Sequence, residues 1–68
     1  MKPRPLIAYS RGTTVRIYGD GIWDIATALG TTVRWDGITI PAERLSDALA
    51  AAQLYKIPII DRTKRPAA

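Results

Sequence analysis

Apolar positions recur at helical spacing in one long segment of the chain, residues 41–56. An α-helix would stack the apolar side chains of this segment on one side: Leu45, Ala48, Leu49, Ala52 and Tyr55. Pro41 suits the first turn of such a helix, and Pro58 ends it. We therefore predict one long helix over residues 41–56. Its thin, alanine-rich stripe predicts close packing against a sheet.

Shorter segments of β-branched or alternating residues predict a small sheet of about four to five strands. The segments are residues 6–9, 13–18, 31–35, 38–40 and 57–60. The last of them contains Pro58, which lacks a backbone N–H and therefore favours the edge of a sheet.

The dipeptide Asp36-Gly37 separates two of these segments and favours a two-residue type I′ turn. In the expected hairpin, Arg34 and Thr39 lie on one face because side chains alternate along a strand. The other face is apolar and forms the predicted floor for the long helix: Val33, Trp35, Ile38 and Ile40.

Residues 22–29 are compatible with two structures. Their apolar side chains have helical spacing, Gly30 suits a left-handed C-terminal cap, and Asp20 suits the N-cap. Alternatively, residues 22–25 extend a hairpin from the preceding strand. The spacing and the glycine favour a short helix over residues 22–29.

These elements predict an α+β fold, in which a small antiparallel-dominated sheet packs against the long helix (residues 41–56) and the short helix (residues 22–29). A chain of 68 residues is large enough for one domain. We place this compact domain at residues 6–61, with a flexible basic arm at residues 1–5 and a disordered basic tail at residues 62–68.

Charge is distributed unevenly along the chain. Residues 1–18 carry four basic and no acidic side chains, and residues 56–68 carry four basic against one acidic. Residues 19–55 carry two basic against five acidic. Basic ends favour contact with a polyanion or with an acidic protein surface. The alternative is that they serve only solubility.

The residue types argue against an enzyme. The chain has no cysteine and no histidine, so Ser10 and Ser46 have no histidine to activate them, and the commonest metal ligand is absent. No glycine-rich phosphate loop is present. We expect no cofactor, no metal and no small-molecule substrate. The apolar run at residues 6–8 is too short for a signal peptide or a membrane span, which predicts a cytoplasmic protein.

The sheet face opposite the long helix is the predicted binding surface. It carries arginines beside an aromatic residue, a combination that can hold phosphates and stack on bases. Residues at the ends of the elements would extend it. The candidate binding residues are Arg11, Arg16, Tyr18, Arg34, Lys56 and Arg62. The alternative is that these are ordinary outward-facing residues.

The sequence therefore predicts a non-enzymatic binding module that contacts nucleic acid or a nucleoprotein complex through this face and its basic ends. The alternative function is a protein–protein inhibitor or adaptor that acts by steric occlusion, as a phage accessory protein blocks a bacterial defence complex. Trp23 is the candidate hot spot for such an interface, or else it folds back onto a small core. Self-association into a homodimer is also open.

Overall fold

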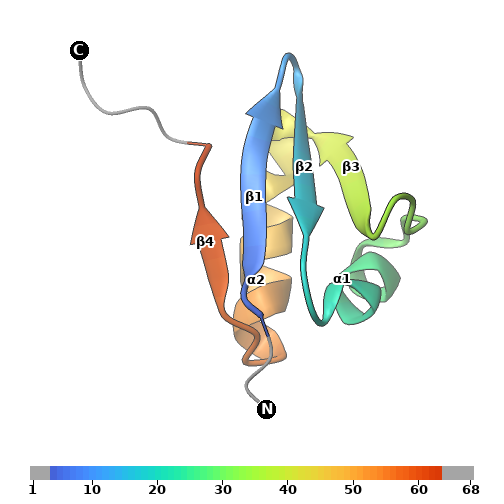
Figure 1. The fold of residues 1–68 in the computed structure, drawn as a ribbon, viewed down its shortest axis with the longest axis vertical. Coiled ribbons are helices and arrows are strands. Elements are labelled where there is room, and N and C mark those ends of the chain that lie inside the picture. Colours follow the sequence, from blue (N-terminus) through green and yellow to red (C-terminus); the bar gives the residue numbers. More distant parts are fainter. Residues whose placement is uncertain (1–3, 64–68) are drawn as a thin grey trace.

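The computed structural model describes residues 4–63, which form a four-stranded sheet and two α-helices (Figure 1). The strands are β1 (Leu6–Arg11), β2 (Thr14–Tyr18), β3 (Gly37–Pro41) and β4 (Ile59–Asp61). The helices are α1 (Ile22–Leu29) and α2 (Leu45–Leu54), and a 3-10 turn, η1 (Ala42–Arg44), leads into α2. The predicted small α+β domain is confirmed.

The sheet is mixed, which corrects the prediction of an antiparallel-dominated one. Its strand order is β3-β2-β1-β4; β2 pairs antiparallel with both β1 and β3, but β4 pairs parallel with β1. The cause is α2, which carries the chain behind the sheet from β3 at one edge to β4 at the other (Figure 1). Such a crossover returns the chain in the same direction. The edge position that Pro58 predicts for the last strand is confirmed.

The helix predicted over residues 41–56 is too long at both ends. Pro41 has an extended ψ of 146° and ends β3, so the helical segment begins as a 3-10 turn. Together, η1 and α2 span 13 residues. At the other end, Lys56 has a φ of 58° and lies beyond the last helical turn.

The hydrophobic core lies between the sheet and the helices. Alternate strand residues fill it from one side: Leu6, Ala8, Val15, Ile17, Ile38 and Ile40. Three small residues of α2 meet them, Ala48, Ala51 and Ala52. These alanines are buried in the same core as the strand residues, and α2 also packs against α1. Tyr55 was expected in this stripe, but it remains partly exposed.

The short helix over residues 22–29 is confirmed, and so is its glycine cap. Gly30 has a φ of 69°, and the N–H of Thr31 donates to the Ala26 carbonyl, which closes the last turn. The N-cap prediction is wrong. Gly21 holds that position, and the Asp20 carboxylate instead accepts a hydrogen bond of 2.7 Å from the backbone N–H of Arg4.

The hairpin predicted around Asp36-Gly37 forms with its turn displaced by one residue. Trp35 and Asp36 are the central residues, with φ values of 55° and 60°. The Arg34 N–H donates to the Gly37 carbonyl at 2.7 Å, and the Gly37 N–H donates back at 3.1 Å. Residues 31–35 form no strand; one isolated bridge joins Arg34 to Gly37.

This displacement moves Trp35 out of the predicted apolar face. A one-residue shift of register sends each side chain to the other side of a sheet. Ile38 and Ile40 are buried as expected, but the Trp35 side chain is exposed to solvent. The floor beneath α2 is therefore built from β1, β2 and β3, without the tryptophan.

The predicted basic arm and basic tail fall largely on residues 1–3 and 64–68, which lie outside the described residues. Within residues 4–63, no helix is long and apolar enough to cross a membrane.

The caps of the two helices predict a stabilising substitution. Lys56 occupies the same left-handed cap position in α2 that Gly30 occupies in α1, since the N–H groups of Lys56 and Ile57 donate to the carbonyls of Gln53 and Ala52. A left-handed conformation is costly for lysine and not for glycine. We expect Lys56→Gly to raise the free energy of unfolding by about 1 kcal/mol in urea titrations.

The matched control is Gly30→Ala, which places a Cβ at the equivalent position of α1 and should lower the free energy of unfolding by a similar amount. A Lys56→Gly variant with unchanged or reduced stability would contradict the assignment of strain to this cap.

Candidate functional site

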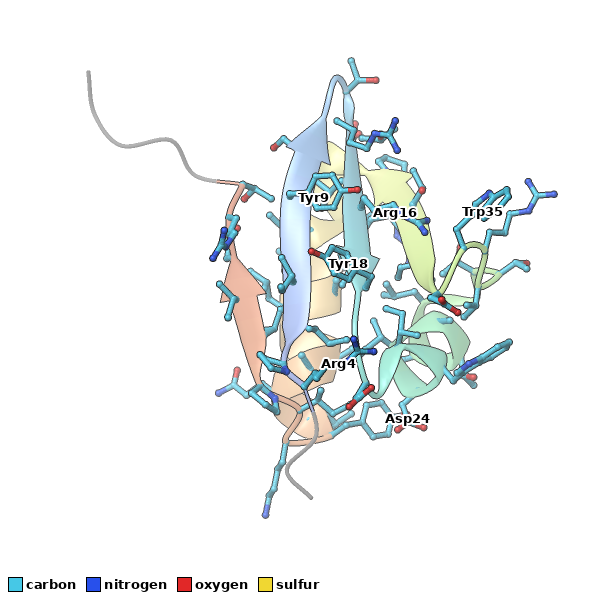
Figure 2. The ribbon with its side chains drawn as sticks, viewed as in Figure 1. Arg4, Tyr9, Arg16, Tyr18, Asp24 and Trp35 are labelled. Atoms are coloured by element: carbon cyan, nitrogen blue, oxygen red, sulfur yellow. The ribbon has the colours of Figure 1, made fainter. Side chains whose placement is uncertain are left out.

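The face of the sheet opposite α2 is polar and aromatic over β2 and β3, with two isoleucines, Ile7 and Ile60, paired on β1 and β4. Across its middle, Tyr9 of β1 pairs with Arg16 of β2, which pairs with Thr39 of β3. Tyr18 lies two residues along β2 and pairs with Gly37. Figure 2 shows Tyr9 and Tyr18 on the near face of the sheet, with α2 behind it. We call this surface the open face.

Two tyrosines form an aromatic pair on the open face. The ring centroids of Tyr9 and Tyr18 are 5.8 Å apart, with an angle of 75° between the ring planes. Such edge-to-face contacts are favourable and restrain the two rings relative to each other. The pair therefore presents an ordered aromatic surface at the centre of the sheet.

Two tryptophans border the same surface. A groove of about 570 Å³ is lined by the tyrosine pair together with Trp23 of α1 and Trp35 of the turn before β3. Both indoles face solvent, because the exposed fraction is 69% for Trp23 and 91% for Trp35. Four aromatic side chains from separate parts of the sequence thus meet around one groove, which we call the aromatic groove.

The guanidinium of Arg16 is committed to the protein itself. Its Nη2 atom donates to the carbonyls of Arg34 at 2.7 Å and of Trp35 at 2.6 Å, and its Nη1 atom donates to Thr39 Oγ1 at 3.3 Å. Only 9% of the residue is exposed. The sequence placed Arg16 among the ligand-binding cations, but the structure places it beneath the turn that carries Trp35.

Gly37 leaves the space that Arg16 occupies. A Cβ at this position would lie 2.6 Å from the Ile17 carbonyl and 3.1 Å from Arg16 Nη2. The backbone of Gly37 does not have a positive φ. The glycine of the Asp-Gly pair is thus required for close approach between strands, and this requirement moves the turn one residue towards the N-terminus.

The remaining candidate cations are exposed and unpaired. Within the described part of the chain, no hydrogen bond or ion pair is made by the side chains of Arg11, Arg34, Lys56 and Arg62. Arg11 ends β1 on the open face. The Arg62 N–H donates to the Ala8 carbonyl, which continues the β1–β4 ladder and places the Arg62 side chain on the same face as Ile60.

Two candidates lie away from the centre of the open face. Arg34 is beside Trp35 at the margin of the sheet, where it lines a second, polar groove with Thr31 and Thr32. Lys56 lies in the cap of α2 and is not part of either groove. None of the four lines the aromatic groove: Arg11 and Arg62 lie elsewhere on the open face, Arg34 lines the second groove, and Lys56 lies apart from them.

Tyr9, Trp35 and Arg4 are among the groove residues that the sequence did not identify. The sequence assigned Tyr9 to a strand that ends at residue 9. Because the strand extends to residue 11, Tyr9 lies on the same face as Arg11. Trp35 was missed because the turn was placed one residue late. Arg4 fell in the predicted arm; it lines the groove, and its guanidinium is 3.6 Å from the Asp20 carboxylate.

The chemistry of this site is stacking combined with charge attraction. The groove offers aromatic faces and is lined by Asp20 and Asp36 as well as by the paired Arg4 and Arg16, whereas the unpaired arginines beyond it offer hydrogen-bond donors to an anion. Among residues 4–63, no group of three acidic side chains is placed to hold a metal ion. Comparisons with protein-family models, with curated proteins and with solved structures find no match to this chain.

The role of Gly37 can be tested by substitution. We expect Gly37→Ala to lower the free energy of unfolding by about 2 kcal/mol, because the new methyl group collides with the Ile17 backbone and the Arg16 guanidinium. The NMR resonance of the Trp35 indole N–H should shift as the turn moves. Gly12→Ala is the control, since Gly12 has a φ of 62° with open space around it. It should cost about 1 kcal/mol from backbone strain and leave that resonance in place.

Proposed function

We propose that the protein is a non-enzymatic module that binds single-stranded nucleic acid, free or exposed in a nucleoprotein complex, through the aromatic groove. The observation that carries this proposal is the meeting of four aromatic side chains in one groove. Unpaired arginines lie outside the groove, at the end of β1, beyond β4 and in the second groove. Unpaired bases have apolar faces that stack on such rings, and their phosphates attract such cations.

The aromatic side chains supply the stacking surfaces. Tyr9 and Tyr18 restrain each other, and Trp35 stands free at the margin of the groove. Stacking of one base on an aromatic side chain contributes about 1 to 3 kcal/mol and tolerates any sequence. Contacts with several rings would thus give useful affinity without base-specific hydrogen bonds.

Arginines at the margins of the open face, outside the groove, supply the phosphate contacts. Arg11, Arg34 and Arg62 lie at different margins of the open face, and their side chains have no acidic partner within residues 4–63. A strand that runs from the groove across the open face can therefore meet one or more of these cations. Because each phosphate contact releases condensed counterions, affinity for a nucleic acid falls as the salt concentration rises.

The form of the groove favours a single strand over a duplex. The aromatic rings must reach the faces of bases, and these faces are stacked against each other within a double helix. No helix of the described structure projects from the open face to enter a major groove (Figure 1). Unpaired bases are therefore the better match.

The test is a fluorescence-polarisation titration with a labelled deoxythymidine oligonucleotide, single-stranded and annealed to its complement, at several salt concentrations. We expect tighter binding of the single strand and weaker binding as salt rises. Tyr18→Ala and Trp35→Ala should each weaken binding by about 1 to 3 kcal/mol.

The controls are matched to these substitutions. Tyr55→Ala removes a partly exposed tyrosine from the end of α2 and should leave binding unchanged. Lys56→Ala removes a cation outside the groove, and Arg62→Ala removes one from the open face; only Arg62→Ala should weaken binding markedly. Absence of binding at low salt would refute the proposal.

One observation favours a second candidate function, a protein–protein inhibitor or adaptor. Trp23 is exposed on α1, with its indole directed to solvent instead of the core. Exposed tryptophans are frequent hot spots of protein interfaces, where truncation to alanine often costs about 2 kcal/mol or more. A partner that covers α1 would act by occlusion, without chemistry.

This second candidate predicts that immobilised protein captures a partner from nuclease-treated host lysate and that Trp23→Ala abolishes the capture. Nuclease treatment removes nucleic acid as a bridge. Leu54→Ala serves as the control, since Leu54 is another exposed apolar residue, at the end of α2. Equal capture by the wild type and Trp23→Ala would exclude Trp23 as the hot spot.

A further inference from the structure

The turn that carries Trp35 is strained. Trp35 and Asp36 both have positive φ values, 55° and 60°, and neither is a glycine. The left-handed region is unfavourable for residues with a Cβ, and type I′ turns are normally built from asparagine, aspartate and glycine. A tryptophan at the first central position therefore needs support from outside the turn.

Arg16 supplies that support. One nitrogen of its guanidinium, Nη2, donates to the carbonyls of Arg34 at 2.7 Å and Trp35 at 2.6 Å, so both carbonyls are fixed from below. The other terminal nitrogen donates to Thr39 on β3, which anchors the guanidinium to the sheet. Figure 2 shows Arg16 extending from β2 on the side of Trp35. The planar guanidinium makes these contacts at once, whereas an ammonium is a point donor.

The side chain that the turn presents makes few contacts of its own. The Trp35 indole is 91% exposed, so its own burial contributes little to holding the turn. The nearly buried Arg16 therefore holds the turn in a strained conformation, although the residue that the turn presents, Trp35, contributes almost nothing to the core. This arrangement is expected where a ligand, and not the fold, requires the position of the side chain.

We propose that Arg16 is a positioning residue for ligand binding. It holds the Trp35 turn in its strained conformation, so that the exposed indole is pre-organised to stack on an unpaired base. This inference rests on the proposed function. Pre-organisation raises affinity because the turn is already ordered when the ligand arrives. Arg16 itself makes no phosphate contact, because its Nη2 atom donates to two backbone carbonyls and its Nη1 atom donates to Thr39.

The salt dependence of binding separates positioning from phosphate contact. Each phosphate contact to a single strand contributes about 0.7 to the slope of log affinity against log salt. We expect Arg16→Met to weaken oligonucleotide binding about tenfold with an unchanged slope. Arg34→Ala, which removes an exposed neighbouring cation, should reduce the slope by about 0.7. A reduced slope for Arg16→Met would overturn the proposal.

The Arg16→Lys variant keeps the positive charge and replaces the two terminal guanidinium nitrogens with a single ammonium nitrogen. If Arg16 positions the turn, lysine cannot replace it: its single nitrogen lies about one bond nearer the backbone than Nη2 and cannot reach both carbonyls while also bonding to Thr39, so affinity falls about as far as in Arg16→Met. If Arg16 contacts phosphate, lysine retains most of the affinity, and that result would also overturn the proposal. Thr39→Val removes only the anchor of the guanidinium and should give a smaller loss in the same direction, in a variant whose core is untouched.

A glycine in the turn should rescue the arginine variants. Asp36→Gly relieves the strain at one of the two positive-φ positions, because glycine adopts that conformation freely. We expect Arg16→Met combined with Asp36→Gly to recover most of the lost affinity. The Asp36→Gly single variant is the baseline, because it also removes a negative charge. No recovery relative to that baseline would count against the strain argument.

A measurement without ligand distinguishes failure of this inference from failure of the proposed function. In a Trp23→Phe background, Trp35 is the remaining tryptophan, and its fluorescence anisotropy decay reports motion of the turn. Arg16→Met should increase local motion, and Asp36→Gly should reverse the increase, with circular dichroism confirming that each variant is folded. Unchanged motion overturns the positioning role, even if the oligonucleotide binds. Increased motion in a protein that binds no oligonucleotide supports the clamp on the turn but overturns its role in stacking, together with the proposed function.

Discussion

Three hydrogen bonds from the Arg16 guanidinium join the turn before β3 to the centre of the sheet, and the shape of the open face depends on them. They determine where Trp35 stands and therefore where the aromatic groove ends. They also require a glycine at position 37, because any larger residue would occupy the path of the guanidinium. A single arginine on a central strand thus links the register of β3, the position of the turn and the composition of the candidate site.

The core of the domain is built from small and aliphatic side chains. A short chain buries a modest fraction of its surface, so each buried contact matters. Alanines of α2 and branched residues from three strands share one core. The large aromatic side chains are mostly not used for this purpose. Trp23 and Trp35 are exposed, and aliphatic residues fill the core. The two exposed tryptophans border the aromatic groove, which is why the proposed binding function is assigned to that surface.

Local sequence signals predicted those parts of the fold that depend on local interactions. The helix at residues 22–29 and the cap at Gly30 follow from spacing and from backbone freedom at one residue, and both are correct. The sequence also predicted that Val15 and Ile17 lie on one face and Tyr18 on the other, because side chains alternate between the two faces of a strand. The edge position of β4 followed from the missing N–H of one proline.

The errors arise where tertiary contacts override local preference. Asp36-Gly37 favours a turn, but Gly37 is needed opposite Tyr18, so the turn moves and Trp35 changes sides. The parallel pairing of β4 depends on the path of α2 across the sheet, which no local signal encodes. Arg16 was expected in the candidate site as a free cation, but its partners are backbone carbonyls, which a sequence does not place in space.

The parallel pairing of β1 with β4 has a consequence for synthesis of the chain. The N–H of Leu6 donates to the Pro58 carbonyl, so the outer edge of the first strand is covered by residues near the other end of the domain. Until residues 58–61 leave the ribosome, β1 offers an open edge that another extended chain can join. The short β4 therefore acts as a cover that closes the sheet last, and nascent or truncated chains that lack it are expected to aggregate through β1.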